Sequence, residues 1–363
     1  MALVSLSASS ASASARVAAP IPDGRSQRLA QAVPLSRLTR FESLCLLGAG
    51  VVINPWLRRG DEGRPLAAVA PVDAEVPVVM RRYRWATPFG WGSYGEAAGQ
   101  FYQPQGVAVS STGDVFVCDY ANHRIQVFRR DGSPVRAWGG QGNAPGQFDH
   151  PVGIAISAAD EVFVCDTYSH RVQVFRPDGS FVRAWGNRGS ATGQFQYPFG
   201  IAIHADLVFV SDSDNDRIQC FRLDGSFVST WGTLGAATGQ FKFPRGLAVS
   251  IAGEVIVCDC YNHRMQVFGL DGTYRRTWGQ RGDATGQVIY PWYVAVSAAG
   301  EVLVSDATRV QVFLADGSFV RCLQLPAGAQ GAFEPRGVAV SPSGDVIVVD
   351  EDNHRVHVEP AGA

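Results

Sequence analysis

The chain has 363 residues, 46% of them hydrophobic, and a formal net charge of −2 at pH 7. Residues 1–76 hold eight of the 31 Lys and Arg residues and six of the 33 acids, which leaves 23 basic and 27 acidic side chains. That balance argues against a surface that coats nucleic acid. The seven cysteines include no CxxC pair or zinc-finger spacing, so this sequence holds no RING or B-box domain.

The first 76 residues differ in composition from the rest of the chain. Residues 1–40 hold eight Ser, five Arg and a single acid, Asp23. This low-complexity composition resembles an organellar transit peptide, and a disordered extension is the alternative. We therefore expect a cytoplasmic protein, or a protein of a plastid or mitochondrion if the leader is a targeting segment.

A short apolar stretch follows at residues 44–57. It is interrupted by Gly48, Gly50, Asn54 and Pro55. It is also shorter than the roughly 20 apolar residues that cross a bilayer as a helix. We expect no membrane span.

From residue 99 onward, a short motif returns at a nearly constant interval. Gly-Gln-Phe begins at Gly99, Gly146, Gly193 and Gly239, and degenerate copies begin at Gly286 and Gly331. Neighbouring copies lie 45 to 47 residues apart. This period is typical of a four-stranded propeller blade and is longer than a leucine-rich or ankyrin repeat.

Each repeat predicts four antiparallel strands. In the first repeat, apolar runs predict strands at 106–110 and 115–119, and period-two alternation predicts a third at 124–128. Asp131-Gly132 predicts a tight hairpin with positive φ at both residues. The chain then returns in a fourth strand at 135–138.

A Trp-Gly pair ends the fourth strand of a repeat, at Trp138, Trp185, Trp231 and Trp278. We expect each indole to lie between neighbouring sheets.

The sixth repeat has strands at 337–341, 346–350 and 355–359 but no fourth. Trp91 precedes Gly99 by the same eight residues that separate Trp138 from Gly146. We therefore expect a strand at 86–91 to pair with 355–359. The predicted fold is all-β, a six-bladed β-propeller closed by an N-terminal strand that completes the last blade.

The motifs Gly-x-Phe, Pro-x-Gly-Val-Ala-Val, Gly-x-Val-x-Val-x-Asp and Asn-His-Arg-Ile-Gln-Val-Phe, between Gly99 and Phe128, resemble the NHL-repeat family of six-bladed β-propellers. The resemblance covers residues 86–359, and we divide the chain into a leader at 1–76 and an NHL-type propeller at 77–363. Family members include substrate- and RNA-binding domains of tripartite-motif ubiquitin ligases, sensor domains of bacterial kinases and a zinc-dependent peptidylamidoglycolate lyase. The resemblance therefore implies a fold more than a function.

Two polar groups recur with the repeat and are expected to be structural. We expect an Asp at the end of each second strand to accept backbone N–H bonds and to pair with a following Arg, at Asp119/Arg124, Asp166/Arg171, Asp212/Arg217, Asp259/Arg264, Asp306/Arg309 and Asp350/Arg355. Histidines of the same turns are expected to form surface or interblade hydrogen bonds, at His123, His170, His263 and His354. They are too widely spread to converge on one metal.

The positions at the start of the first strands break the repeat symmetry. These strands surround the channel of a propeller, and the residues before the repeat glycine are Gln105, Val152, Phe199, Arg245, Trp292 and Arg336. None is a histidine, whereas the resemblance places zinc-binding histidines of the lyase at such positions; His150 stands two residues away and alone. A cationic, aromatic patch suits an anionic or carboxylate-bearing partner. The predicted binding residues are Arg245, Trp292, Tyr293 (which replaces the glycine), Arg336, Lys242, Phe199 and Gln105, with Arg188 and Arg281 in nearby loops.

These patterns favour a non-enzymatic scaffold that recognises a protein partner through its loop face and channel mouth. No nucleophile and base can be read from the motifs, so we expect no catalytic residues, no metal and no cofactor. An RNA-binding propeller and a metal-dependent lyase or hydrolase at the channel mouth are the alternatives. We expect the propeller to be a monomer.

Overall fold

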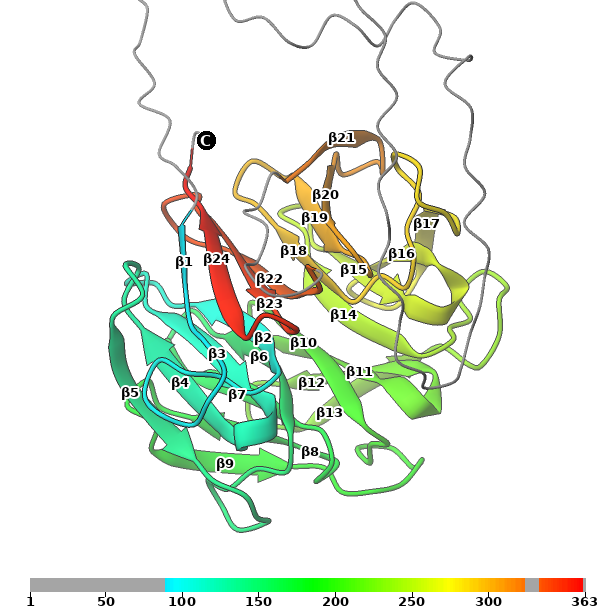
Figure 1. Ribbon diagram of the computed structural model, residues 1–363. Helices are drawn as coiled ribbons and strands as arrows, with labels where there is room; N and C mark the ends of the chain where they lie inside the picture. Colours follow the sequence, from blue (N-terminus) through cyan, green and yellow to red (C-terminus); the bar gives the residue numbers. More distant parts are fainter. Residues whose placement is uncertain (1–88, 324–332, 362–363) are drawn as a thin grey trace, which may run out of the picture. The chain divides into compact units, whose positions relative to one another are not determined.

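The computed structural model describes residues 89–323 and 333–361 of the chain. The leader, and residues 86–88 of the expected closing strand, lie outside the described residues. The described part forms six four-stranded antiparallel sheets, the blades of a propeller (Figure 1). The predicted fold class is thereby confirmed.

The first three blades take their strands in chain order. Blade 1 holds β2 (Pro104–Val109), β3 (Val115–Asp119), β4 (Arg124–Phe128) and β5 (Pro134–Gly139). Blade 2 holds β6 (Pro151–Ile156), β7 (Val162–Asp166), β8 (Arg171–Phe175) and β9 (Phe181–Trp185). Blade 3 holds β10 (Pro198–His204), β11 (Leu207–Asp212), β12 (Arg217–Arg222) and β13 (Phe227–Trp231).

The last three blades complete the ring. Blade 4 holds β14 (Pro244–Val249), β15 (Glu254–Asp259), β16 (Arg264–Gly269) and β17 (Tyr274–Trp278). Blade 5 holds β18 (Tyr293–Val296), β19 (Val302–Ser305), β20 (Val310–Phe313) and β21 (Phe319–Cys322). Blade 6 holds β22 (Pro335–Val340), β23 (Val346–Asp350) and β24 (Arg355–Glu359), with β1 (Phe89–Trp91) as its outer strand.

The ring closes as the Trp91 spacing predicts. In Figure 1, β1 at the start of the described chain lies beside β24 near its end. The two strands are antiparallel, with Phe89 opposite Val358 and Trp91 opposite Val356. A sheet that would otherwise expose a strand edge is therefore paired with a segment from the other end of the chain.

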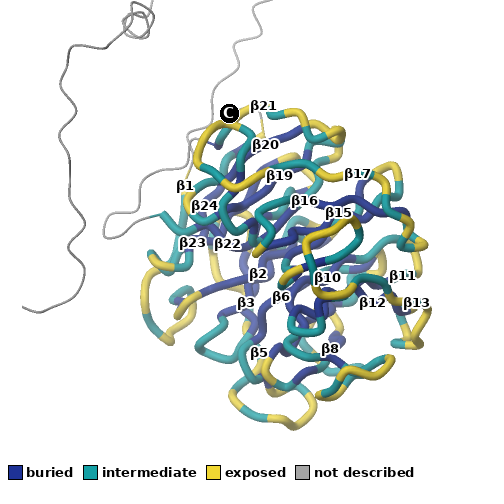
Figure 2. Tube along the Cα trace, turned by 90° about the vertical axis from the view of Figure 1, so that its right-hand side faces the viewer, coloured by how far each residue is buried: buried dark blue, intermediate teal, exposed yellow. Residues whose placement is uncertain are grey.

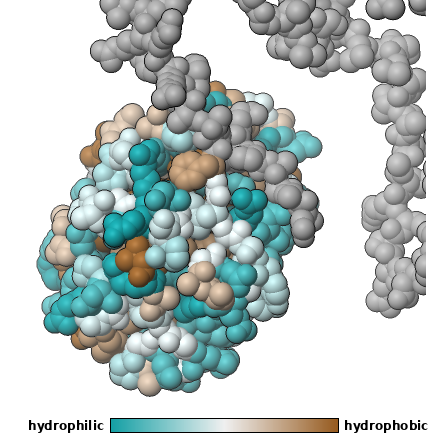
Figure 3. Space-filling view, turned by 60° about the vertical axis from the view of Figure 1, so that its left-hand side comes forward, coloured by the Kyte–Doolittle hydropathy of each residue, from teal (hydrophilic) through white to brown (hydrophobic). Residues whose placement is uncertain are grey.

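The core of each blade comes from its middle strands. Every residue of β3 is buried, as is every residue of β4 after Arg124, because neighbouring blades cover both faces of these strands. Figure 2 shows buried backbone in the interior of the ring and exposed backbone in the connecting loops. Large apolar side chains that remain exposed are scattered, Leu234 and Ile251 among them, and the face in Figure 3 shows only small, separate hydrophobic patches.

The repeated tryptophans lie between blades, as expected. The Trp138 ring centroid is 5.8 Å from that of Phe175 in blade 2, and Trp185 makes the same contact with Phe221. Each indole also covers the glycine of the next Asp-Gly turn: a Cβ on Gly179 would lie 2.8 Å from the Trp138 ring. The indole and the glycine are thus two halves of one interblade contact.

The Asp-Gly hairpin differs in one detail from its prediction. Gly132 has the positive φ, 86°, and its N–H bonds to the carbonyl of Arg129. Asp131 acts instead through its side chain, whose Oδ1 accepts the N–H of Ser133 at 2.9 Å. The connection is therefore a β-turn followed by a left-handed glycine, which lengthens the expected two-residue loop.

The recurrent Asp residues anchor each blade to the loop before it. Asp119 Oδ1 accepts the N–H of Tyr102 at 2.8 Å, and its Oδ2 accepts Arg124 Nε at 2.7 Å. Equivalent Asp-Arg pairs form in four further blades, at Asp166, Asp212, Asp259 and Asp306. The predicted sixth pair is wrong within the described residues: Asp350 is bonded by Asn353 and by His357, which replaces the glutamine of the other blades.

The turn histidines join one blade to the next, which confirms their expected structural role. His170 Nδ1 accepts the N–H of Tyr197 at 3.1 Å, and His263 Nδ1 accepts that of Tyr290 at 3.1 Å. His123 and His354 make the same bond to His150 and Gln103. In the one complete turn that lacks a histidine, Asp216 accepts the N–H of Phe243 instead.

These bonds predict a loss of stability in mild acid. Burial lowers the pKa of His170 and His263 in the folded chain. Below an unfolded pKa of about 6.5 these two histidines therefore bind more protons in the unfolded chain than in the folded one, and their contribution to stability falls as pH falls. We expect the urea midpoint to drop between pH 7.5 and pH 5.

The matched variant is His170→Asn with His263→Asn. An asparagine tolerates the left-handed backbone and still offers an oxygen to the N–H, but it does not titrate. Its urea midpoint should vary less with pH than that of the parent chain. The difference between the two proteins corresponds to on the order of 1 kcal/mol in unfolding free energy. Equal pH slopes for both proteins would contradict the prediction.

Candidate functional site

A pocket opens where the first strands of the blades begin, at one mouth of the channel. Its volume is about 510 Å³, and the side chains around it come from all six blades. Of the seven predicted binding residues, the structure brings five into its wall: Gln105, Phe199, Arg245, Trp292 and Arg336. The sequence prediction thus identified much of this wall.

Two arginines stack on aromatic rings in the pocket. The Arg245 guanidinium carbon lies 4.4 Å from the Phe199 ring centroid and 4.5 Å from that of Trp292. The Arg336 guanidinium carbon lies 4.0 Å from the Trp292 ring centroid. Cation–π contacts of this kind hold both cations in place on Trp292.

The charge of Arg336 is partly neutralised by carboxylates of the same blade. Its Nε donates to Glu351, and its Nη2 donates to Glu334 Oε1 at 3.0 Å. Gln105 Nε2 donates to the other oxygen of Glu351 at 2.8 Å, so Glu351 is held from two sides. The sequence analysis identified the arginines as pocket residues but did not identify Glu334 and Glu351.

Donor capacity nevertheless remains in the pocket wall. Among the described residues, Arg336 Nη1 and Arg245 Nε are buried and have no hydrogen-bond partner. Arg336 as a whole is only 7% exposed. Asp214, on the opposite wall, has a pKa raised by burial and lowered in part by the charge of Arg245. Buried donors without a partner are costly.

Tyr293 lies below the pocket rather than in its wall. It lines a small cavity of about 50 Å³ among the channel glycines, and its hydroxyl donates to the Val152 carbonyl of blade 2 at 3.5 Å. Burial raises the pKa of this phenol. The side chain thus spans the channel from blade 5 and supports Phe199, whose ring centroid is 5.3 Å away.

Lys242 does not reach the pocket. Its side chain is exposed, and its backbone N–H donates to Asp259 Oδ1 at 2.8 Å in the interblade loop. Phe243, with a φ of 52°, turns the chain between Lys242 and the strand that carries Arg245. Lys242 therefore lies outside this pocket, and its part in binding stays a prediction.

The comparisons agree with this architecture. The NHL repeat family model matches residues 101–128, 148–175, 241–268 and 334–358. The chain is an NHL-repeat β-propeller. The four matched repeats are those with a histidine in the turn after the second strand, whereas the third repeat has Asp216 there and the fifth is shorter at Ala307-Thr308.

Two curated proteins are each similar to a short stretch of this chain. A B-box type zinc finger protein, ncl-1 of Caenorhabditis elegans, is 52% identical over 42 residues, and brain tumor of Drosophila melanogaster is 48% identical over 42 residues. The matched stretch is 12% of this chain but only 5% and 4% of those proteins. Their whole-protein properties are therefore not carried over.

Solved structures share the fold of the NHL propeller at low sequence identity. A streptogramin B lyase is 11% identical with a TM-score of 0.56, covering 76% of this chain and 98% of that one. A gluconolactonase of Xanthomonas campestris is 15% identical with a TM-score of 0.56, covering 72% and 87%. These values show a common fold and nothing more. Within the described residues, no helix has the length and apolar character needed to cross a membrane.

Sequence reasoning missed a second ring of pocket residues. In four blades the residue after the anchoring Asp lies in the pocket wall, and this column of the NHL repeat supplies Tyr120, Thr167, Ser213 and Glu351. Tyr168 and Tyr197 extend the aromatic side, with ring centroids 5.2 Å apart. An alignment of the residues after each anchoring Asp would have shown that this position varies among the repeats as much as the position before the repeat glycine.

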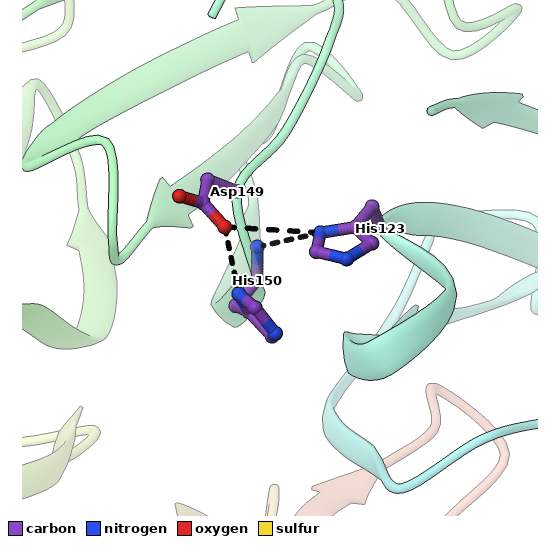
Figure 4. A group of neighbouring side chains, drawn as sticks. All are labelled: His123, Asp149 and His150. Atoms are coloured by element: carbon purple, nitrogen blue, oxygen red, sulfur yellow. Dashed lines mark hydrogen bonds and ion pairs between the residues drawn. The ribbon is translucent and has the colours of Figure 1, made fainter. Parts of the chain in front are cut away.

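A separate polar cluster lies at the junction of blades 1 and 2. His123, Asp149 and His150 each place a potential metal-ligand atom within 4.8 Å of the others (Figure 4). Burial, and then the neighbouring His150, lowers the pKa of His123. Treating His150 as isolated was therefore wrong, because the fold places it beside a histidine of the preceding blade.

Proposed function

We propose that this NHL propeller is a non-enzymatic recognition module that binds a protein partner at its channel-mouth pocket. The partner would insert an acidic side chain or a terminal carboxylate between Arg245 and Arg336. The observation that carries the proposal is the pair of arginines, Arg245 and Arg336, that stack on Trp292 in the pocket wall. A carboxylate has the planar pair of acceptors that such donors require.

The remaining wall is suited to a peptide around that carboxylate. Tyr120, Tyr168 and Tyr197 offer aromatic surface with hydroxyl groups, which is typical of protein interfaces. A volume of about 510 Å³ is within the range of pockets that take a few residues or a small ligand. The net charge of the propeller disfavours an RNA backbone, which remains the competing ligand for a patch of arginine and aromatic rings.

The proposal of a non-enzymatic role rests on the state of Glu351. Glu351 is committed to Arg336 and Gln105, so it is an ordered ion-pair partner and a poor general base. The location of the protein, cytoplasmic or organellar, stays a prediction, because the leader lies outside the described residues. The monomeric state stays a prediction as well.

Peptide selection tests the proposal. The full chain is offered a random peptide library with free carboxyl termini, and we expect the selected peptides to share an acidic residue or to depend on the terminal carboxylate. Replacing that acid by its amide should lower the affinity, measured by fluorescence anisotropy, by at least about tenfold.

Single-stranded RNA is the competing probe. Filter binding should show only weak retention of RNA. The salt series identifies phosphate contacts, because a ligand held by its phosphates loses affinity steeply as salt rises. Tight, steeply salt-dependent RNA binding would overturn the proposal in favour of a nucleic-acid site. Selected peptides without any acidic preference would also contradict it.

A further inference from the structure

The junction between blades 1 and 2 holds three side chains of the kinds that bind transition metals. Asp149 Oδ1 lies 2.7 Å from His150 Nδ1 and 3.9 Å from His123 Nδ1. In Figure 4 the carboxylate faces both imidazoles, one from the turn after β3 and one from the loop before β6. Among the described residues, this is the one group of three such side chains found close together.

The backbone of all three residues is fixed by the fold. His123 has a φ of 53° and ends a short 3₁₀ turn, Tyr120–Asn122. His150 has a φ of 58°, and the N–H of Asp149 donates to the buried Asp166 at 2.7 Å. A site on such a backbone needs only side-chain rotation to receive an ion, which keeps the ordering cost low.

The cluster is a departure from the NHL repeat rather than part of it. At the next junction, His170 faces Gln196 and Tyr197, and at a later one His263 faces Ile289 and Tyr290. The interblade hydrogen bond thus forms at these junctions without a carboxylate or a second histidine. Structure alone therefore does not require Asp149 and His150 at this junction.

We propose that His123, Asp149 and His150 bind a zinc ion at the rim of the channel mouth. Two imidazoles and one carboxylate are a typical three-ligand set for Zn²⁺, whereas Mg²⁺ and Ca²⁺ prefer oxygen ligands alone. Ligand atoms about 2.0–2.1 Å from a tetrahedral ion lie about 3.3 Å apart, between the two separations found here. This proposal departs from the expectation that the chain binds no metal.

Binding requires one local exchange. His123 Nδ1 accepts the N–H of His150 at 3.2 Å, and His150 Nδ1 contacts Asp149 Oδ1. An ion ligated by these atoms would replace both bonds, and the backbone N–H of His150 would lose His123 Nδ1 as its acceptor. The side chains of Asp149 and His150 are 37% and 28% exposed, so water has access for the fourth coordination position. Tyr120 of the pocket wall lies beside the cluster, with its ring centroid 4.5 Å from that of His150.

Zinc titration of the full chain tests the site. Untagged protein is stripped with EDTA and titrated with ZnCl₂ in a calorimeter, and we expect one site of micromolar affinity or tighter. His150→Gln and Asp149→Asn should each weaken binding by more than about 100-fold while the circular dichroism spectrum is unchanged. Asp149→Asn retains the backbone N–H that bonds to Asp166, so it preserves the fold.

The matched control is His263→Gln, which changes a turn histidine that has no carboxylate beside it. Its zinc affinity should equal that of the parent chain. Co²⁺ is the spectroscopic probe, and visible absorption of a tetrahedral complex should appear in the parent and be lost in His150→Gln. Failure of the parent to bind Zn²⁺, equal affinity in parent and His150→Gln, or binding of Mg²⁺ in preference to Zn²⁺ would each overturn the proposal. None of these outcomes bears on peptide binding in the pocket, so the two proposals fail separately.

Discussion

Gly153→Val is expected to prevent the propeller from folding. Gly153 lies in β6, the first strand of blade 2, which runs against β10, the first strand of blade 3. A Cβ at this position would lie 2.1 Å from the backbone carbonyl oxygen of Phe199. Neither strand can move aside, because each also contacts another blade in a closed ring. We expect a loss of unfolding free energy of more than about 4 kcal/mol.

The same contact recurs around the channel, which makes the prediction general. A Cβ would approach the next blade's backbone to 2.2 Å at Gly106 and to 2.4 Å at Gly200. Thermal melts followed by circular dichroism, with the soluble yield, measure the effect. The control is Gly113→Asn, in a surface turn with φ of 87° and open space around it, where asparagine is tolerated. A Gly153→Val protein that melts within a few degrees of the control would show that the ring opens easily.

Blade 5 shows how the ring accommodates the one exception. Tyr293 occupies the glycine position there, and β18 begins at this residue instead of two residues earlier. Its N–H bonds to the hydroxyl of Ser305 at 3.1 Å, and that hydroxyl donates to the Arg336 carbonyl at 2.7 Å. A serine side chain thus bridges the blade 5 to blade 6 contact, which leaves space for the tyrosine to enter the channel.

The fold was predictable because its signal is repeated. Strands predicted at 115–119 and 124–128 match β3 and β4, and the position of Trp91 alone implied the pairing of β1 with β24. A turn residue that is ambiguous in one repeat is supported by its equivalents in the others. The one turn detail that was wrong, at Asp131, involves side-chain capping that strand patterns do not report.

The candidate sites were harder to predict because they depend on residues that occur once. Arg336 was recognised as a cation, but its neutralising partner Glu351 lies in a different column of the repeat. His123 and His150 are 27 residues apart, the same separation that joins His170 to Tyr197 and His263 to Tyr290. That offset could have placed the two histidines together, but only once the interblade bond was known.

Exchanging both pocket arginines for glutamine is expected to abolish recognition of acidic peptides. Arg245→Gln with Arg336→Gln removes both cations and the two partnerless guanidinium N–H groups. It also leaves Glu334 and Glu351 at the pocket without Arg336, so an incoming carboxylate meets net negative charge. Affinity for a selected acidic peptide should fall by about 100-fold or more in fluorescence anisotropy.

The control for the double variant is Arg188→Gln with Arg281→Gln. It removes the same two charges from exposed interblade loops outside the pocket wall, so long-range electrostatics change equally in both proteins. Its peptide affinity should stay within about threefold of the parent. Arg245 and Arg336 share Trp292, so their effects on binding are coupled. Each single variant should therefore lose more than half of the binding free energy that the double variant loses, and the two single losses should not add up to the double loss. Equal affinities of the pocket and control variants would show that the ligand is held elsewhere, since total charge would then explain any difference from the parent.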